Sequence, residues 1–407
     1  MKNDSNDYVI RVLDSPLDID ARAWNALLSE QEKDGVINPF MRHEYLAAMH
    51  ESGSAVPETG WTPRFITLWN SETLAGACAL YLKSHSYGEY VFDWAWANAY
   101  QQHGLKYYPK ALVAAPFTPV PGARLLARTP EDRTLLVKAI TAWCGEEKLS
   151  SLHLLFVDDE DVQACEAAGL MLRHTVQFHW QNINPASGEK FRDFDDFLMS
   201  LNQEKRKKIR QERRKVLDAG ITFRKALGKD IASSDWDFFY ECYERTYYEH
   251  GNAPYLSRNF FQRMQDTMPE NWLLFIAEHT GAGGEVQPIA ASLIAISASP
   301  AAEGGVQKPA IAYGRYWGAL ARVDCLHFEA CYYQPLEWCI ANGYQRFEGG
   351  AQGEHKMARA LLPVKTTSAH WLAHPAFADA VERFLEKEVA GIAGYMNELK
   401  SRSPLKA

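Results

Sequence analysis

The chain has 407 residues and a net charge of −8 at pH 7, from 51 acidic and 43 basic side chains. With 47% hydrophobic and 23% charged residues, it is neither an intrinsically disordered nor a fibrous sequence. The length allows two or three domains. The acidic balance disfavours a protein that coats nucleic acid non-specifically, but it permits a local basic patch.

The cysteines and the N-terminal sequence indicate the compartment. Seven cysteines are scattered along the chain without a CxxC pair, which favours free thiols in a reducing environment. The N-terminus lacks a basic region followed by an apolar run, and no apolar stretch approaches the roughly 18 residues of a membrane span. We therefore expect a soluble, cytoplasmic protein without a membrane span.

The predicted elements of the first half recur in the second half. A helical pattern at residues 43–49 precedes an alternating run at 64–69, a turn, and an apolar run at 74–82, which predicts a helix followed by a β-hairpin. The same order recurs at residues 255–264, 272–277 and 289–296, with a glycine-rich turn at 281–284. Because that turn lies between two strands, it does not match a phosphate-binding loop.

A second repeated pair of elements extends the correspondence. Residues 135–144 and 328–339 are helical by spacing, and both contain a Trp-Cys pair, Trp143-Cys144 and Trp338-Cys339. Each leads to a short strand, at residues 152–157 and 345–348. We infer a tandem duplication of one α/β unit of about 200 residues.

Turn-rich residues 184–188 follow a predicted strand at 175–182 and mark the junction. The expected domains are residues 8–184 and 185–400, the second with a basic helical segment at 194–219. Residues 299–305 read as a long loop, and a helix is expected from Pro375 to about residue 400.

Several catalytic motifs are missing from the sequence. It contains no GxxxxGK[ST] loop, no GxSxG elbow and no HExxH pair, and no spacing supports a metal site. We expect no metal and no covalently bound cofactor.

The basic run at residues 205–215 is the first candidate binding feature, with eight basic residues and one acidic residue. Like charges this close repel one another unless a polyanion binds. A phosphate-bearing partner is therefore the functional interpretation, and a solvated helix face is the alternative. The candidate phosphate-binding residues are Lys205, Arg206, Lys208 and Arg210.

An aromatic segment at residues 92–110 is the second candidate. Its tryptophans and tyrosines, together with an acid and a histidine, suit a pocket for a small polar acceptor, and a structural core wall is the alternative. The candidate residues are Asp93, Trp94, Trp96 and His103.

The third candidate is the glycine-rich loop after the strand at 345–348. Glycines let backbone amides approach a substrate closely, and Lys and His side chains stabilise an oxyanion or move protons. A tight structural turn is the alternative. The polar residues there are Glu348, Gln352, Glu354, His355 and Lys356.

Specific motifs along the chain carry a family resemblance. They lie at residues 92–96, 107–110, 116–119, 205–207, 254–256, 313–317, 327–329, 350–356 and 368–371. With them the chain resembles, over about residues 36–388, the FemAB-like peptidoglycan biosynthesis/recognition branch of the GNAT acyltransferase superfamily. The resemblance implies an α/β protein of two tandem GNAT-like domains, each a mixed, mostly antiparallel sheet flanked by helices.

The resemblance also implies an activity. FemAB-like enzymes move an aminoacyl group from tRNA to the amine of a peptidoglycan precursor, whereas GNAT enzymes move an acyl group from coenzyme A to an amine. Residues 318–326, where GNAT domains carry an R/Q-x-x-G-x-G/A segment, lack that pattern, which favours a donor other than acetyl-CoA. We therefore predict an N-acyltransferase whose donor is acyl-CoA or aminoacyl-tRNA.

In the predicted mechanism an acceptor amine attacks the donor carbonyl in a pocket between the two domains. Lys356 would stabilise the oxyanion or the donor phosphates, His355 or Glu348 would take the amine proton, and Asp93 and His103 would orient the acceptor. Further pocket residues are Tyr313, Arg315 and Glu329. The alternatives are a non-catalytic binding protein for a cell-wall precursor or tRNA, and a plain nucleic-acid-binding protein, which the acidic remainder of the chain disfavours.

Overall fold

The computed structural model describes residues 8–31, 36–281, 283–297, 310–351 and 353–406. The chain divides into two compact units: unit 1 takes residues 1–33, 40–176 and 365–395, and unit 2 takes 34–39, 177–364 and 396–407. Each unit therefore includes a segment from the other half of the chain. The predicted loop at 299–305 and the candidate residue Gln352 lie outside the described residues.

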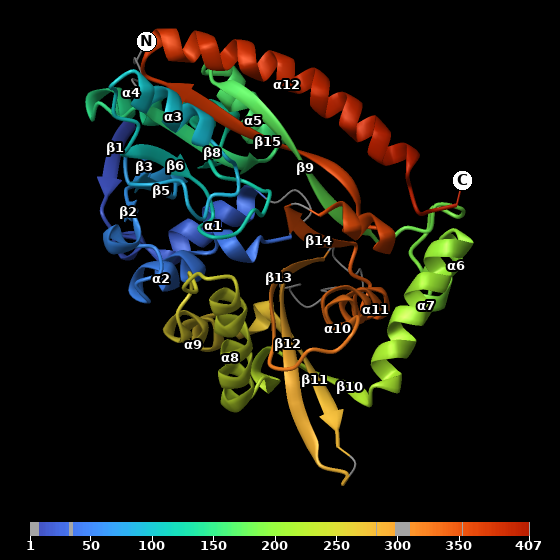
Figure 1. The fold of residues 1–407 in the computed structure, drawn as a ribbon. Coiled ribbons are helices and arrows are strands. Elements are labelled where there is room, and N and C mark those ends of the chain that lie inside the picture. The colour runs from blue at the N-terminus through green and yellow to red at the C-terminus, as the bar shows by residue number, and fades with distance from the viewer. Residues whose placement is uncertain (1–7, 32–35, 282, 298–309, 352, 407) are drawn as a thin grey trace. The chain divides into compact units, whose positions relative to one another are not determined.

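Unit 1 contains two groups of paired strands (Figure 1). The first is antiparallel, in the order β1 (Tyr8–Leu13), β3 (Phe65–Asn70), β4 (Thr73–Cys78) and β7 (Leu126–Ala127). The second has the order β2 (Trp61–Pro63), β5 (Leu80–Lys83), β6 (Lys110–Val113), β8 (Ser151–Val157), β15 (Leu362–Leu372) and β9 (Met171–Gln181). Within it, β6 and β8 are parallel.

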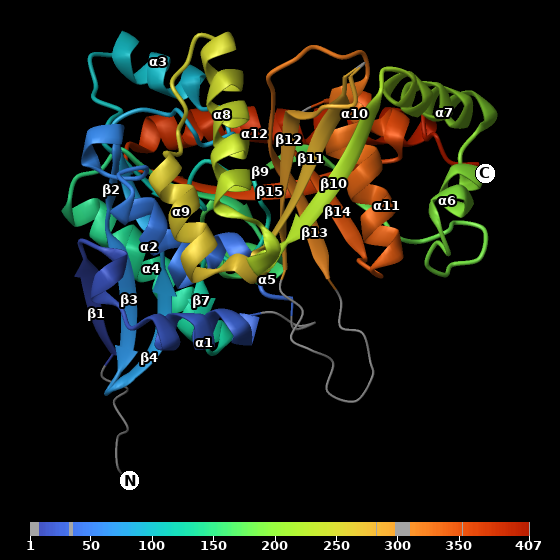
Figure 2. The ribbon, with the colours of Figure 1, turned by 90° about the horizontal axis from the view of Figure 1, so that it is seen from below.

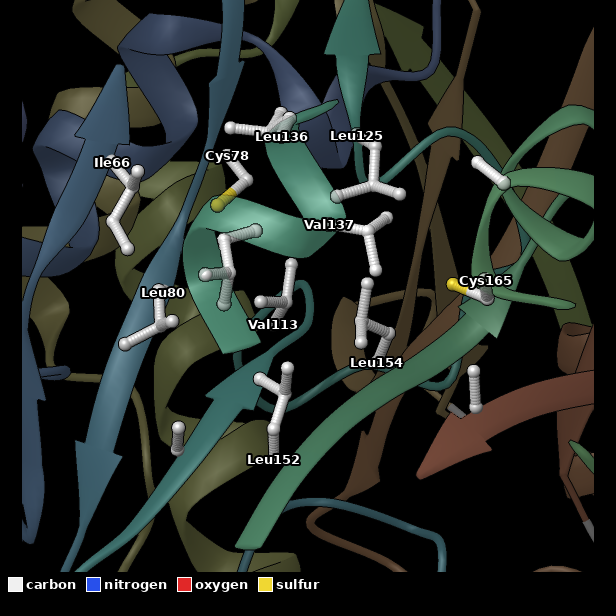
Figure 3. Packing of buried hydrophobic residues seen from close by; sticks show 14 of the residues in the cluster. Ile66, Cys78, Leu80, Val113, Leu125, Leu136, Val137, Leu152, Leu154 and Cys165 are labelled. Carbon is white, nitrogen blue, oxygen red and sulfur yellow. The ribbon is translucent and has the colours of Figure 1, made fainter. Parts of the chain in front are cut away.

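The core of unit 1 forms around one helix. This helix, α4 (Pro130–Glu146), begins where the Thr129 hydroxyl accepts a hydrogen bond from the Asp132 amide, with proline in its first turn. Leu136 and Val137 point from it into a buried apolar cluster that β3, β4, β5, β6 and β8 complete (Figure 3). The other helices are α1 (Ala21–Gln31), α2 (His43–Glu51), α3 (Trp94–Gln102), α5 (Asp159–Ala167) and α12 (Pro375–Ser401), with short 3₁₀ turns η1 (Pro16–Asp18), η2 (Pro39–Met41, at the boundary with unit 2) and η3 (Pro57–Thr59).

Unit 2 contains one mixed sheet. Its order is β10 (Ile221–Leu227), β11 (Trp272–Thr280), β12 (Val286–Ile296), β13 (Ile311–Ala319), β14 (Arg346–Ala351) and the end of β9 from Gln177. Neighbouring strands are antiparallel except β13 and β14, which are parallel.

Helices cover both faces of this sheet (Figure 2). The helices of unit 2 are α6 (Phe194–Ser200), α7 (Gln203–Asp218), α8 (Ser233–Glu249), α9 (Arg258–Thr267), α10 (Leu326–Phe328), the π-helical turn η6 (Glu329–Tyr333) and α11 (Gln334–Ala341), with 3₁₀ turns η4 (Gly228–Asp230), η5 (Pro269–Asn271) and η7 (Glu354–Arg359). On β13, a Cβ at Gly318 would lie 1.8 Å from the carbonyl oxygen of Cys242 in α8, so glycine permits this close packing. From the opposite face of β13, the Trp317 ring contacts His327 of α10 at 5.5 Å between centroids.

The element order confirms the duplication. The elements of the first half follow the order α2, β3, β4–β5, β6, α4, β8, β9. The corresponding elements of the second half are α9, β11, β12, β13, α11, β14 and β15. The two Trp-Cys pairs lie on the corresponding helices α4 and α11. The final strands are exchanged. β15 pairs with β8 of unit 1, and the end of β9 pairs with β14 of unit 2.

Other sequence predictions have clear outcomes. The predicted helical segment 194–219 is two helices rather than one, because Leu201 is extended and the Asn202 side chain starts α7 by accepting from the Lys205 amide. The C-terminal helix is confirmed as α12, and all seven cysteines are free. Within the described ranges, no helix combines the length and apolar character needed to cross a bilayer.

Candidate functional site

A pocket opens in unit 2 where β13 and β14 separate. The two strands pair only over Ile311–Tyr313 and Arg346–Glu348, and β13 then continues to Ala319 without β14 beside it. Directly after the paired segment, Arg315 is the extra residue of a β-bulge opposite β12. A bulge changes the direction of nearby side chains, and here it aims Arg315 into the opening.

The pocket has a volume of about 170 Å³. This is close to the roughly 150 Å³ of an engineered cavity that binds benzene. Its lining comes from β12, β13, the α10–η6 segment, β14 and η7, all in unit 2: Ser292, Ile294, Gly314, Arg315, Tyr316, Trp317, His327, Cys331, Tyr332, Phe347, Gly349 and Lys356.

Two cationic side chains line the pocket. Lys356 is 7% exposed and donates from Nζ to the carbonyl oxygen of Gly349 at 2.6 Å. Arg315 donates to the carbonyl oxygens of Gly314 and Glu348, both at 3.0 Å. Burial, reinforced by the Arg315 charge, lowers the pKa of Lys356 to about 8. Near neutral pH the pocket thus holds a lysine that is still mainly charged and poorly solvated.

An imidazole and a thiol lie on the helical wall of the pocket. His327 and Cys331 are four residues apart and face the same side of the α10–η6 segment. Burial lowers the pKa of His327 to about 4 and raises the pKa of Cys331 to about 12. At neutral pH His327 is therefore uncharged and can accept a proton, whereas the thiol is protonated.

The other residues predicted around the glycine-rich loop take different positions. Glu348 is fully buried behind Arg315, with ion pairs to Arg315 at 3.5 Å and Arg346 at 2.9 Å. His355 and Glu354 are exposed on η7, and Glu354 pairs with Arg402 at 2.9 Å. None of these three side chains lines the 170 Å³ pocket. Their neighbour Lys356 does.

Two further predicted residues lie near the pocket without lining it. Tyr313 is buried at the last paired position of β13, with its ring centroid 5.7 Å from the Arg315 guanidinium. Glu329 lines a separate hollow of about 470 Å³ with Arg213, to which it is bound at 3.1 Å. Burial raises the pKa of Glu329.

Asp93 belongs to a buried ion cluster in unit 1. Lys110 donates to Asp93, to Glu89 at 2.7 Å and to Ser86 at 2.8 Å, and Tyr107 donates to Asp93 at 2.6 Å. Although burial opposes it, the Lys110 charge holds the pKa of Asp93 below its usual range. This cluster joins the 84–93 loop to β6.

The aromatic candidates of unit 1 divide between core and surface. Trp96 is buried against His153 and His370, with ring centroids 5.9 and 5.1 Å away. Trp94 is 38% exposed, and His103 is exposed at the end of α3, bonded through Nδ1 to the carbonyl of Ala99.

The candidate phosphate-binding residues lie on α7, along one side of which runs an open hollow of about 960 Å³. Arg206 and Arg210 line it; Lys205 and Lys208 do not. The hollow is completed by Met199, Gln203, Lys207, Gln211, Arg214 and Lys215. Because its cations recur every four residues, they form one basic face of the helix.

Sequence reasoning missed most of the pocket lining. Ser292 is the polar residue in the otherwise apolar run 289–296, and the four-residue spacing of His327 and Cys331 was a recognisable sign of a shared helical face. Neither sign indicated the bulge that brings Arg315 beside Lys356. Within the described residues, no group of three or more His, Cys, Asp or Glu side chains is arranged to hold a metal ion.

Comparisons with known proteins identify the family. A model of the FemAB-like family, described as peptidoglycan biosynthesis/recognition, matches residues 15–407. No curated protein matches the sequence.

Solved structures are similar in fold at low identity. FemX is 11% identical, with a TM-score of 0.53, and the match covers 89% of this chain and 98% of FemX. The C-terminal DUF2156 domain of an Agrobacterium fabrum protein assigned as a lysylphosphatidylglycerol synthetase is 10% identical, with 92% and 97% covered and a TM-score of 0.50. A tandem GNAT protein from the clavulanic acid pathway is 11% identical, with 91% and 99% covered and a TM-score of 0.43. The chain therefore belongs to the FemAB-like family, and its fold is similar to that of FemX.

Proposed function

We propose that this protein transfers a small acyl or aminoacyl group from an activated ester or thioester to an amine. The observation that carries the proposal is the 170 Å³ pocket with Lys356 and Arg315 at the separation of β13 and β14. A pocket of this volume accepts a group of about six non-hydrogen atoms, by comparison with the benzene-sized cavity. It is too small for a long acyl chain.

In the proposed reaction the acceptor nitrogen forms a bond to the donor carbonyl carbon. The carbonyl π electrons move to oxygen, and the Lys356 ammonium stabilises the resulting oxyanion. His327 accepts the proton from the nitrogen and then gives it to the leaving oxygen or sulfur as the ester or thioester bond breaks. The products are an amide and the free alcohol or thiol of the donor, with no net proton change.

His327 takes the place in this mechanism that sequence reasoning gave to His355 or Glu348. His327 lines the pocket, whereas His355 is exposed on η7 and does not line it, and Glu348 is bound to two arginines. Proton transfer requires hydrogen-bond reach of the reacting nitrogen. Geometry therefore favours His327.

An aminoacyl-tRNA is the donor that the surface of unit 2 supports best. Arg206, Arg210 and Arg214 form a row about 12 Å long on α7, which an extended phosphate backbone can follow. Residues 318–326, in contrast, lack the glycines with which GNAT domains hold a pyrophosphate. An acyl-CoA is the alternative donor. Its phosphates would meet Arg245 and Arg322 in a hollow of about 320 Å³ that shares Trp317 and His327 with the pocket.

The acceptor we propose is the amine of a peptidoglycan precursor. Membership in a family described by peptidoglycan biosynthesis/recognition supports this choice. The second candidate function, a binding protein without catalysis, predicts retention of the precursor or tRNA without a new covalent bond.

The test is a transfer assay read by mass spectrometry. The full chain is incubated with a soluble nucleotide-linked peptidoglycan precursor and either charged bulk tRNA or a set of short acyl-CoAs. We expect a mass increase on the precursor that needs charged tRNA and is lost in Lys356→Ala. An increase with acyl-CoA alone would reassign the donor, and binding without any mass increase would establish the non-catalytic alternative.

A further inference from the structure

One acidic residue of the basic helix α7 points inward. Glu212 is 7% exposed, although the residues around it on the helix, Arg210 and Arg214, are exposed. A buried carboxylate is costly unless it is paired and hydrogen-bonded. The partners of Glu212 therefore indicate what the inner face of α7 does.

Those partners come from the two segments that form the pocket. Arg359, the last residue of η7, donates from one guanidinium nitrogen to both carboxylate oxygens of Glu212, at 3.1 and 2.9 Å. Tyr333, the last residue of η6, donates its hydroxyl to Glu212 and accepts from Arg359 Nε at 3.2 Å. Arg359 is 3% exposed and Tyr333 is fully buried, so the three side chains form a closed buried cluster.

Arg359 also fixes the turn that carries Lys356. It donates to the carbonyl oxygen of His355 at 2.9 Å, and its guanidinium stacks 3.6 Å from the centroid of the Phe328 ring. The turn is bounded by two left-handed residues, Gly353 at φ 99° and Ala360 at φ 59°. A short turn with such ends has few internal bonds, so an external contact contributes strongly to its position.

Tyr333 connects the cluster to the helical wall of the pocket, which η6 forms. It directly follows Cys331 and Tyr332, which line the pocket from η6. A π-helical turn is a departure from the regular helical bond pattern that is common at functional sites. The cluster therefore connects α7 to both sides of the pocket.

We propose that Glu212, Arg359 and Tyr333 are positioning residues for Lys356: by joining α7 to η7 and η6, they hold the lysine ammonium at the pocket. They do not touch the reacting atoms. The inference rests on the proposed function for the importance of Lys356, but the position of the lysine can be measured without substrate.

The experiment measures the rate at which trinitrobenzenesulfonate modifies Lys356 at pH 7.5 in the full chain, by mass spectrometry of the peptide that contains it. Glu212→Gln keeps the side-chain size and removes the charge, and Tyr333→Phe removes only the hydroxyl. We expect both variants to change the modification rate of Lys356 by about fivefold or more, because small displacements at a site have large effects on reactivity.

The matched control is Glu337→Gln. Glu337 pairs with Arg213 of α7 at 2.7 Å and so also links α7 to a neighbouring helix, α11, but neither residue belongs to the cluster of Glu212, Arg359 and Tyr333. Its Lys356 modification rate should stay within about twofold of the wild-type rate, because it leaves the Glu212–Arg359 pair intact. Thermal unfolding of each variant identifies those that fold.

The outcomes separate the two proposals. A folded Glu212→Gln or Tyr333→Phe variant with the wild-type Lys356 rate would overturn the positioning role, whatever the enzyme transfers. If Glu212→Gln does not fold, the conservative Tyr333→Phe variant decides. A transfer activity that survives Lys356→Ala would instead overturn the proposed function and leave the labelling result standing.

Discussion

Lys356 and Lys83 are both buried lysines, but their surroundings differ. Lys356 lines a pocket beside Arg315, and its ammonium donates to a backbone carbonyl. Lys83 has no exposed surface; it donates to the carbonyl of Tyr87 at 3.1 Å and lies 3.6 Å from the centroid of the Trp61 ring. The first environment suits a developing negative charge, and the second suits packing. The two lysines therefore have different predicted responses to pH and substitution.

Transfer should lose rate in alkaline solution. The pKa of Lys356 lies at about 8, below its usual value, so the ammonium needed at the oxyanion is lost as the pH rises through that value. We expect kcat to fall about tenfold per pH unit above this point. Lys356→Arg, which stays charged, should lack this alkaline decline. A decline of equal size in Lys356→Arg would assign it to another group.

His327 should matter more than His355. His327→Gln removes the pocket imidazole, and we expect kcat to drop by about 10²-fold, within the usual range for a general base. The matched comparison is His355→Gln, which makes the same substitution at an exposed position. This variant should retain most of the wild-type activity. Steady-state rates with equal substrate concentrations check this, and the opposite order would return the proton-transfer role to His355.

Replacing Lys83 should stabilise the protein. Burial lowers the pKa of Lys83 to about 7, so between that pH and its unfolded value the unfolded chain binds more protons and stability rises with pH. Lys83→Met removes this cost, and we expect a gain of about 1–2 kcal/mol at pH 7 that becomes smaller towards pH 10. Denaturant unfolding at both values of pH measures it; a loss of stability at pH 7 would mean that the ammonium contact with Trp61 outweighs desolvation.

At the scale of elements, α7 has two functions on two faces. Its outer face carries the basic row at the 960 Å³ hollow, and its inner face buries Ile209, Glu212 and Val216. Eight basic residues were evident in the sequence, and those that face outward are the ones off the buried stripe of Ile209, Glu212 and Val216. Asn202 sets the start of the helix, and the sequence prediction of one continuous helix did not include the break before it.

The basic face should bind polyanions through a defined subset of its residues. Arg206→Glu with Arg210→Glu reverses two charges that line the hollow, and we expect tRNA binding to weaken by about tenfold or more, with a smaller slope against salt concentration. Lys205→Glu with Lys208→Glu, on the same helix but outside the hollow, is the control. Fluorescence anisotropy over a salt series compares them. Equal losses in both pairs would mean that only total charge matters.

Sequence patterns predicted elements better than they predicted the pocket. The helix-hairpin order and the Trp-Cys pairs were sufficient for the duplication because they depend on local periodicity. Lys356 followed from its glycine-rich surroundings. The pocket, however, depends on where β14 leaves β13 and on the bulge at Arg315, both of which are set by non-local pairing. Non-local pairing also explains why Glu348 was predicted to accept the proton of the amine: the sequence did not show that its carboxylate binds two arginines.

At the scale of the whole molecule, the exchanged strands make each unit depend on both halves of the sequence. β8 of unit 1 pairs with β15, which lies near the end of the chain, and α12 adds Val381 and Leu385 to the apolar cluster around Trp96. A repeat whose sheet contained only its own strands would not need a strand from the other half of the chain. The repeated order of elements in the sequence shows the duplication but not the exchange.

An isolated first half should therefore fold poorly. Residues 8–184 alone would leave the edge of β8 unpaired and the Trp96 cluster uncovered, and unpaired edges favour aggregation. We expect broad, non-cooperative unfolding by circular dichroism, and recovery of a cooperative transition when residues 365–401 are fused through a flexible linker. Cooperative unfolding of residues 8–184 without the fusion would contradict the importance of the exchanged strand.

The most direct test of the central claim is the single-turnover rate of transfer to a nucleotide-linked peptidoglycan precursor by wild-type protein and by Lys356→Ala, with the donor that the mass assay identifies. Removing one oxyanion-stabilising group typically costs about 10²–10³-fold. We predict a loss of this size in Lys356→Ala, with the fold retained and donor binding within a few-fold of wild type. A single-turnover rate in Lys356→Ala equal to the wild-type rate would contradict the account.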